Sequence, residues 1–313
     1  MKSQRPVQYV RDASALEALA GDLASSERIA LDTEFMRERT YYARLCLVQV
    51  ATDDLMAVVD PLACENLEPL WNVVTGGPEV VFHAASQDLE IIIQEAGALP
   101  AAHFDTQVAA SFLGYGDSIG HSRLVASLTG NTLGRSEAYT DWARRPLSQE
   151  QVDYALDDVR YLLSMRDRLG AELETAGRAA WVEQELAALA SRVRAEPDVE
   201  NLWRRVKGGR GLRGGKLAVL REVAAWREKE AQRRDIPRQR VLPDHVLAEV
   251  SRRTPRRIEQ IERLRGVNPR EAQRSGDALL AAVARGLELP PEQHPDWGAP
   301  APHAADPRID AFA

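Results

Sequence analysis

The segment Ile29–Phe35 most strongly constrains what this chain can fold into, because it is an apolar strand that carries two acidic residues. Side chains alternate between the faces of a strand, so Asp32 and Glu34 share one face while Thr33 lies on the other. Two neighbouring carboxylates on so apolar a strand repel each other and resist burial unless cations offset their charge. The pair therefore indicates a cation site, with a half-exposed strand that has one polar face as the alternative.

Short apolar runs alternate with helical patterns through the first part of the chain, which is typical of an α/β domain. The first three runs follow one another closely and favour an antiparallel meander. A helix is expected after the fourth run, with Ser86 as its N-cap and Gly97 at its end. The predicted strands are Ile29–Phe35, Leu45–Ala51, Leu55–Val59 and Val80–Ala84.

A third carboxylate, Asp88, falls in the first turn of that helix. It follows the carboxyl end of a predicted strand, where α/β proteins usually place their functional sites. Taken alone, Asp88 is equally well explained as a favourable charge at a helix N-terminus.

A later helix has the clearest start in the chain. Ser148 and Gln151 have the spacing of a capping box, so the helix is expected to begin at Gln149 and to end near Gly170.

This helix contributes a fourth carboxylate and a tyrosine. At 100° per residue, Tyr154 and Asp158 are neighbours on a flank of its apolar face, whereas Asp157 points away from the core. The geometry therefore selects Asp158 over Asp157. The predicted core face consists of Val152, Ala155, Leu156, Val159, Leu162 and Leu163.

Four carboxylates and a tyrosine on three elements are what two-metal phosphodiester hydrolysis requires. Two Mg²⁺ or Mn²⁺ ions, roughly 3.5–4 Å apart, need hard oxygen ligands and room for phosphate and water. Such ions activate the attacking water and stabilise the leaving 3′ oxygen, and a tyrosine hydroxyl can orient that water.

Three segments resemble the exonuclease motifs of ribonuclease D, a DEDD-family enzyme of the tyrosine subclass. They read LDTEFMRERTYYARLCLVQVA, VFHAASQDLEII and DWARRPLSQEQVDYALDDVRYLL, and they occur in the expected order over about residues 20–170. The histidine subclass would have a histidine where this chain has Asp153. The resemblance implies a ribonuclease-H-like fold, a mixed sheet flanked by helices, and 3′→5′ exonuclease activity. It assigns the metal and catalytic roles to Asp32, Glu34, Asp88 and Asp158, with Tyr154 as a further catalytic residue.

Other residues are weaker candidates. Gln49, His83 and Arg145 are candidate substrate contacts, but each has a structural alternative, such as an ion pair for Arg145. A metal role for His83 is disfavoured because Mg²⁺ prefers oxygen ligands. Asp105 is expected to cap the helix that follows it.

The charge of the chain is divided unevenly. Residues 198–290 contain 22 Lys and Arg against 13 Asp and Glu, a balance of about +9, while the rest of the chain has 18 against 34, about −16. An acidic part joined to a basic part suggests a nucleic-acid partner for the basic one, with merely solvated basic helices as the alternative.

The strand signal disappears from about residue 198. A glycine-rich link precedes a helix from about Lys216, and Thr254-Pro255 and Asn268-Pro269 predict two further helix starts, with Gly286 ending the last helix. This part resembles the HRDC domain, a small all-α unit, which implies auxiliary nucleic-acid binding. The expected organisation is a catalytic domain over 1–197, a linker over 198–212, one HRDC domain over 213–290 and a poorly ordered tail over 291–313. Too little chain follows for a second HRDC domain.

No apolar run reaches the length of a membrane helix, no secretory signal is present, and Cys46 and Cys64 suit two reduced thiols, so a cytoplasmic protein is expected. The leading hypothesis is an exoribonuclease that releases 5′-mononucleotides from RNA with a free 3′ end, including tRNA precursors. No obligatory protein partner is evident. The alternatives are a DNA-directed 3′→5′ exonuclease and an inactive RNA-binding adaptor.

Overall fold

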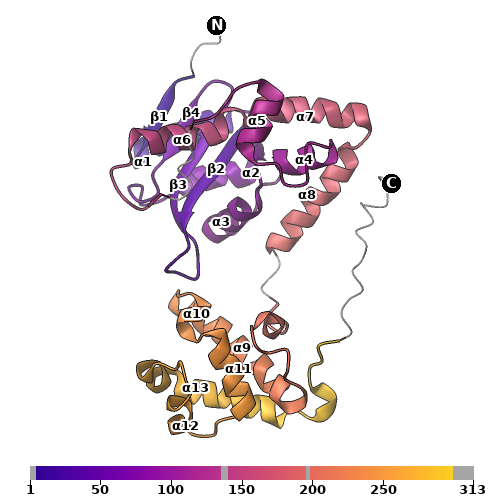
Figure 1. Ribbon diagram of the computed structural model, residues 1–313. Helices are drawn as coiled ribbons and strands as arrows, with labels where there is room; N and C mark the ends of the chain where they lie inside the picture. Colours follow the sequence, from indigo (N-terminus) through magenta and orange to yellow (C-terminus); the bar gives the residue numbers. More distant parts are fainter. Residues whose placement is uncertain (1–4, 135–139, 195–197, 299–313) are drawn as a thin grey trace. The chain divides into compact units, whose positions relative to one another are not determined.

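The computed structural model describes residues 5–134, 140–194 and 198–298. Contacts divide the chain into two compact units (Figure 1). The first comprises Met1–Arg37 and Ala43–Glu196, and the second comprises Glu38–Tyr42 and Pro197–Ala313. Within the described ranges, no helix is long and apolar enough to span a membrane.

The first unit is built around a mixed sheet, which has six strands over the described residues (Figure 1). These are β1 (Val7–Val10), β2 (Arg28–Met36), β3 (Arg44–Ala51), β4 (Met56–Val59), β5 (Glu79–Phe82) and β6 (His103–Asp105). Their order is β1-β4-β3-β2-β5-β6. The predicted meander is confirmed, since β2, β3 and β4 pair antiparallel, while β1, β5 and β6 join in parallel. The edge strands β1 (VQYV) and β6 (HFD) were not predicted, because polar residues interrupt them, whereas the equally short β4 and β5 contain apolar runs.

Helices cover both faces of this sheet. They are α1 (Ala13–Ala24), α2 (Glu68–Gly76), α3 (Ser86–Ala96), α4 (Thr106–Phe112), α5 (His121–Thr129), α6 (Gln149–Arg160), α7 (Leu162–Ala176) and α8 (Ala179–Arg194). One apolar core lies between the sheet and α1, α2 and α3, and includes Ile29 and Leu31. The other lies against α4, α5, α6 and α7, and includes Ala30. The alternation along β2 therefore directs Asp32 and Glu34 to the face that α6 covers.

The start of α3 differs from the prediction. Ala85 occupies the cap position and Ser86 is already helical. The backbone N–H groups of Ala84 and Ala85 donate to the carboxylate of Asp105, at 3.0 and 2.8 Å. Asp105 also caps α4, which confirms its predicted role, so one carboxylate organises the starts of two helices.

The predicted end of a helix at Gly170 is wrong, although the capping box of Ser148 and Gln151 is confirmed. The chain breaks between α6 and α7, and Gly170 lies inside α7. The apolar periodicity gave no sign of this break because Val159 and Leu162, on either side of it, enter the same core.

Among the described residues, all regular elements of the second unit are helices. They are η1 (Leu202–Arg205), α9 (Gly214–Arg234), α10 (Arg238–Val241), α11 (Asp244–Arg253), α12 (Ile258–Glu262), α13 (Pro269–Glu288) and η2 (Pro291–Gln293), where η marks a 3-10 turn. A separate core centred on α9 includes Leu217, Leu220 and Val223.

The predicted helix starts in this unit had mixed outcomes. Asn268 caps α13 as predicted, accepting a hydrogen bond from the N–H of Arg270. Thr254 instead ends α11 in a left-handed conformation, with φ 44°, so a helix start there was wrong. Gly286 lies within α13 rather than at its end. A Cβ at this glycine would lie 2.5 Å from the Cα of Val219, so the close packing of α9 and α13 requires it.

The beginning of the expected tail has a defined place. Residues 291–293 form η2, and the ring of Trp297 lies 4.7 Å from that of Trp203, centroid to centroid. The Trp297 indole N–H donates to the Leu212 carbonyl at 3.1 Å. The remainder of the tail, 299–313, lies outside the described residues.

Candidate active site

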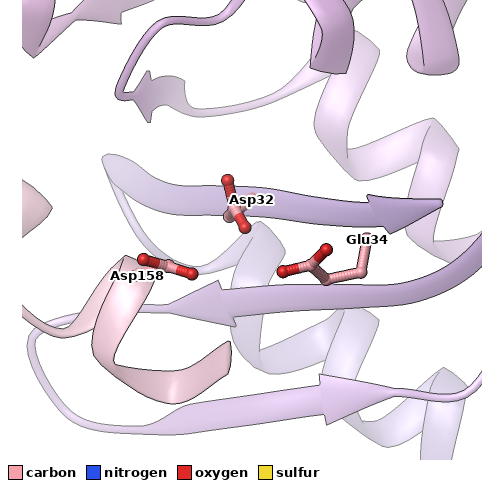
Figure 2. Close-up of side chains that lie close together, drawn as sticks. All are labelled: Asp32, Glu34 and Asp158. Atoms are coloured by element: carbon pink, nitrogen blue, oxygen red, sulfur yellow. The ribbon is translucent and has the colours of Figure 1, made fainter. Parts of the chain in front are cut away.

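Three carboxylates from two elements meet on one face of the sheet. Asp32 and Glu34 come from β2 and Asp158 from α6, and one oxygen of each lies within 4.8 Å of the others. Figure 2 shows Glu34 and Asp158 pointing toward each other, with Asp32 beside them. The strand and helix periodicities together bring these three side chains to one place.

A β-bulge lies beside Glu34. Asp32 pairs with Gln49 and Glu34 with Leu47, but Phe35 then pairs with Leu45, so Cys46 is the extra residue of β3. A bulge increases the local twist and changes the direction of adjacent side chains. Sequence patterns did not indicate this irregularity, which lies beside the two carboxylates of β2.

Asp88 approaches from α3 but does not belong to the cluster of three carboxylates. It is buried, and one of its oxygens accepts a hydrogen bond of 2.6 Å from the hydroxyl of Thr33. Thr33 lies between Asp32 and Glu34 in sequence. The hydrogen bond therefore joins α3 to the part of β2 that carries the cluster.

Asp32, Glu34 and Asp88 have raised pKa values. Burial, with added repulsion from Asp158 and Asp88, raises the pKa of Glu34 to about 9. Burial raises the pKa of Asp88 to about 7, although the Thr33 hydrogen bond acts in the opposite direction. The pKa of Asp32 is also well above its ordinary range, through burial first and then repulsion from Asp88, Asp158 and Glu34.

These side chains fit divalent cations. All of the donors are carboxylate oxygens, which Mg²⁺ and Mn²⁺ prefer. Closely spaced buried carboxylates are unfavourable while ionised, and nearby cations would remove that penalty by taking the place of protons. The oxygen donors and the raised pKa values thus both indicate that this cluster favours bound positive charge.

A pocket of about 370 Å³ opens over the cluster, and Tyr154 is in its lining. The centroid of the Tyr154 ring lies 6.1 Å from that of the buried Trp142 ring. In α6, Tyr154 precedes Asp158 by one helical turn. The predicted position of Tyr154 beside Asp158 thus corresponds to the observed one. The pocket is lined by Asp32, Thr33, Glu34, Phe35, His83, Gln87, His121, Tyr154 and Asp158.

Comparison with known proteins identifies the family. Residues 7–174 match a family model described as 3′-5′ exonuclease, and residues 216–283 match one described as HRDC domain. A ribonuclease D from Gluconacetobacter diazotrophicus is 47% identical over 84% of this chain and 67% of its own length. The chain belongs to the ribonuclease D family. The resemblance drawn from the three motifs and the predicted class of enzyme, a 3′-5′ exonuclease, are confirmed.

The fold agrees with that of solved ribonuclease D. The crystal structure of Escherichia coli RNase D, described as an exoribonuclease involved in structured RNA processing, is 34% identical. It superposes with a TM-score of 0.84 over 93% of this chain and 77% of that one. Brucella melitensis NrnC with bound Mg²⁺ is 25% identical, with a TM-score of 0.53 over 61% of this chain and 92% of that one. The predicted ribonuclease-H-like domain followed by an HRDC domain is confirmed.

Arg145 is engaged in an ion pair. Its guanidinium donates to both carboxylate oxygens of Asp60, at 2.6 and 2.7 Å, and to the carbonyls of Trp142 and Cys46. It is not part of the pocket lining. This arrangement favours the structural alternative over contact with a substrate phosphate.

His83 and Gln49 lie nearer the cluster. His83 lines the pocket, and burial lowers its pKa to about 3, so it is neutral. Gln49 is fully buried opposite Asp32, and neither polar atom of its amide has a hydrogen-bond partner among the described residues. A substrate contact stays a prediction for both residues.

Sequence reasoning missed His121, which lines the same pocket from the first position of α5. Its Nδ1 lies 3.3 Å from an oxygen of Asp158. A single histidine after a glycine has no periodic or motif signal, so only the tertiary structure shows this relationship.

Proposed function

We propose that the chain removes 5′-mononucleotides from the 3′ ends of RNA, with two divalent cations held by Asp32, Glu34, Asp88 and Asp158. The observation that carries this proposal is the convergence of three carboxylates within 4.8 Å beneath one pocket. The ions are Mg²⁺ or Mn²⁺, for which the donor set supplies only oxygen. The Mg²⁺ bound to Brucella melitensis NrnC supports this assignment.

Each residue of the site has a distinct task. Bound ions would supply an activated water and stabilise charge on the scissile phosphate and the leaving oxygen. Asp32, Glu34 and Asp158 would bind the cations on one face of the pocket, and the Asp88 carboxylate would contribute further negative charge from α3. Tyr154, which lines the pocket, orients the attacking water through its hydroxyl.

The size of the pocket suits an exonuclease. Its volume of about 370 Å³ is near the lower end of the range for small-molecule sites. Such a space accommodates one terminal nucleotide rather than a duplex. We therefore assign it to the nucleotide at the 3′ end, with the preceding nucleotides outside it.

The HRDC unit supplies positive charge for the RNA backbone. Many of its arginines are paired with carboxylates, such as Arg252 and Arg253 with Glu249. Others are exposed and have no ion pair among the described residues, and these can bind phosphates. Five of them lie close to α12 in the sequence: Arg256 and Arg257 precede it, and Arg263, Arg265 and Arg270 follow it, the last within α13.

The substrate class includes tRNA precursors, which present a single-stranded 3′ end on a structured RNA. The structured-RNA processing of the Escherichia coli relative supports this choice. The same proposal places the activity in the cytoplasm, where such precursors are trimmed. A DNA substrate is the second candidate, because the phosphodiester chemistry is the same and only the 2′-hydroxyl distinguishes the two.

One digestion experiment tests this function. Single-stranded RNA and DNA of the same sequence, labelled at either end, are incubated with Mg²⁺, with Mn²⁺ or with chelator. The expected result is stepwise release of 5′-mononucleotides from the 3′ end of RNA, with no release in chelator. Faster digestion of DNA would overturn the substrate assignment, and undiminished activity in chelator would overturn the metal assignment.

A further inference from the structure

A histidine lies against one of the proposed metal ligands without being part of the ligand cluster. His121 Nδ1 is 3.3 Å from Asp158 Oδ1, and the two side chains are only 12% and 18% exposed. The atoms that lie within 4.8 Å of one another come from Asp32, Glu34 and Asp158, and His121 is not in that set. His121 therefore contacts one carboxylate rather than the space that all three share.

The ring of His121 has hydrogen-bonding capacity that nothing else uses. Both of its nitrogens are shielded from solvent, and neither has a hydrogen-bond partner among the described residues. Nδ1 is within ion-pair distance of Asp158 but is not aligned for a hydrogen bond. A hydrogen bond from Nδ1 to this carboxylate would give the buried nitrogen a partner, and leaving such a donor unpaired is unfavourable.

The backbone that carries His121 is held in place by its neighbours. The carbonyl of Ile119 accepts hydrogen bonds from His83 Nε2 at 3.1 Å and from the Gln107 side-chain amide at 3.0 Å. Because a carbonyl only accepts, His83 carries its proton on Nε2, and its Nδ1 lies 2.9 Å from the Thr106 hydroxyl oxygen. His83 thus restrains the segment before α5, and its ring lies 5.3 Å from that of His121, centroid to centroid.

We infer that His121 is a positioning residue for Asp158: it donates from Nδ1 to Oδ1 and thereby holds the Asp158 carboxylate in one orientation at the proposed metal site. Hydrogen-bond partners of ligating groups commonly orient those groups and tune their affinity for the ion. This inference rests on the proposed function, because it requires Asp158 to hold a metal ion. Direct ligation by His121 is the competing role, and the ligand geometry disfavours it.

Matched amide substitutions test the position of the donor. The amide nitrogen of asparagine can occupy the place of Nδ1, whereas the longer glutamine places its amide beyond it. Mn²⁺ affinity is measured by calorimetry for wild type, His121→Asn and His121→Gln, together with kcat and KM on one RNA. We expect His121→Gln to bind Mn²⁺ about 10- to 100-fold more weakly, with KM for RNA unchanged at saturating metal, and His121→Asn to retain most of the affinity.

Two results would overturn this role. One is equal Mn²⁺ affinity in His121→Gln and wild type, and the other is equal loss in His121→Asn and His121→Gln when both unfold at the wild-type temperature. A nitrogen coupling in the electron paramagnetic resonance spectrum of bound Mn²⁺ that disappears in His121→Gln would show ligation, and would also overturn it.

Asp158→Asn, measured in parallel, separates failure of this inference from failure of the proposed function. If Asp158→Asn binds Mn²⁺ and digests RNA like wild type, the proposed metal site is wrong. If Asp158→Asn loses both properties while His121→Gln loses neither, only the role of His121 is wrong.

Discussion

The hydroxyl of Thr33 donates a hydrogen bond of 2.6 Å to the carboxylate of Asp88, with both side chains buried. This contact connects the two elements that carry Asp32 and Asp88, and it opposes the effect of burial on the pKa of Asp88. The hydrogen bond thus favours the ionised form of Asp88, which is the form that can hold a cation.

Replacing Thr33 by valine should therefore weaken the site while keeping the shape of the side chain. We expect Thr33→Val to lower the free energy of unfolding by about 1–3 kcal/mol and to weaken Mg²⁺ binding, because Asp88 loses its donor. Thr33→Ser keeps a hydroxyl and is the control. Denaturant unfolding and metal titration check both variants, and similar losses in Thr33→Ser would argue against the hydrogen bond.

Tyr154→Phe removes the hydroxyl from the pocket and leaves the ring against Trp142. If the hydroxyl orients the attacking water, kcat should fall by about 10²- to 10⁴-fold, while Mn²⁺ affinity and stability stay near wild type. Single-turnover digestion of a short RNA measures the chemical step. A wild-type rate in this variant would exclude tyrosine from the mechanism.

The raised pKa values predict how stability depends on pH in the absence of metal. The pKa of Glu34 rises from its ordinary 4.5 to about 9, and that of Asp88 rises from 3.8 to about 7. The folded chain therefore keeps protons that the unfolded chain releases. The stability that these groups contribute is fully present at pH values below their ordinary pKa values. It is lost as pH rises through about 7 for Asp88 and about 9 for Glu34.

Thermal unfolding in chelator, repeated across that pH range, checks this dependence. The unfolding temperature should fall as pH rises, and Mg²⁺ should restore it most at the alkaline end, because cations replace the lost protons. Glu34→Gln cannot titrate and should flatten the curve. A metal-free protein that becomes more stable across the range would contradict the electrostatic description of the cluster.

The arginines beside α12 should determine how RNA binding depends on salt. Arg256→Gln with Arg257→Gln removes two charges that have no ion pair among the described residues. The slope of log affinity against log salt should decrease by about 0.7 for each lost phosphate contact to single-stranded RNA. The control is Arg252→Gln with Arg253→Gln, where both charges are paired with Glu249, and it should change the slope less. Equal slopes in the two double variants would contradict a contact between RNA and the arginines beside α12.

Sequence patterns were sufficient for the residues whose position depends on local periodicity. Asp32 and Glu34 share a strand face and Asp158 follows Tyr154 by one helical turn, so their directions could be predicted before the fold was known. The family motifs added the order of the elements. Both arguments concern neighbours along the chain.

Contacts between distant segments could not be predicted in this way. The bonds of Asp88 to Thr33 and of Arg145 to Asp60 join residues 55 and 85 positions apart. His121 reaches Asp158 only because α5 and α6 cover the same face of the sheet. Thr254-Pro255 has the composition of a helix start, yet packing places Thr254 at a helix end.

The adjacent residues Asp157 and Asp158 provide the most direct test of the central claim, that the convergent carboxylates hold the catalytic cations. Asp157 pairs with Arg160 on the helix surface, whereas Asp158 joins the cluster. The measurement is the single-turnover rate at which Asp157→Asn and Asp158→Asn release 5′-mononucleotides from RNA in Mg²⁺. We predict a rate near wild type for Asp157→Asn and a loss of at least about a thousandfold for Asp158→Asn. Equal rates in the two variants would contradict the proposed metal site.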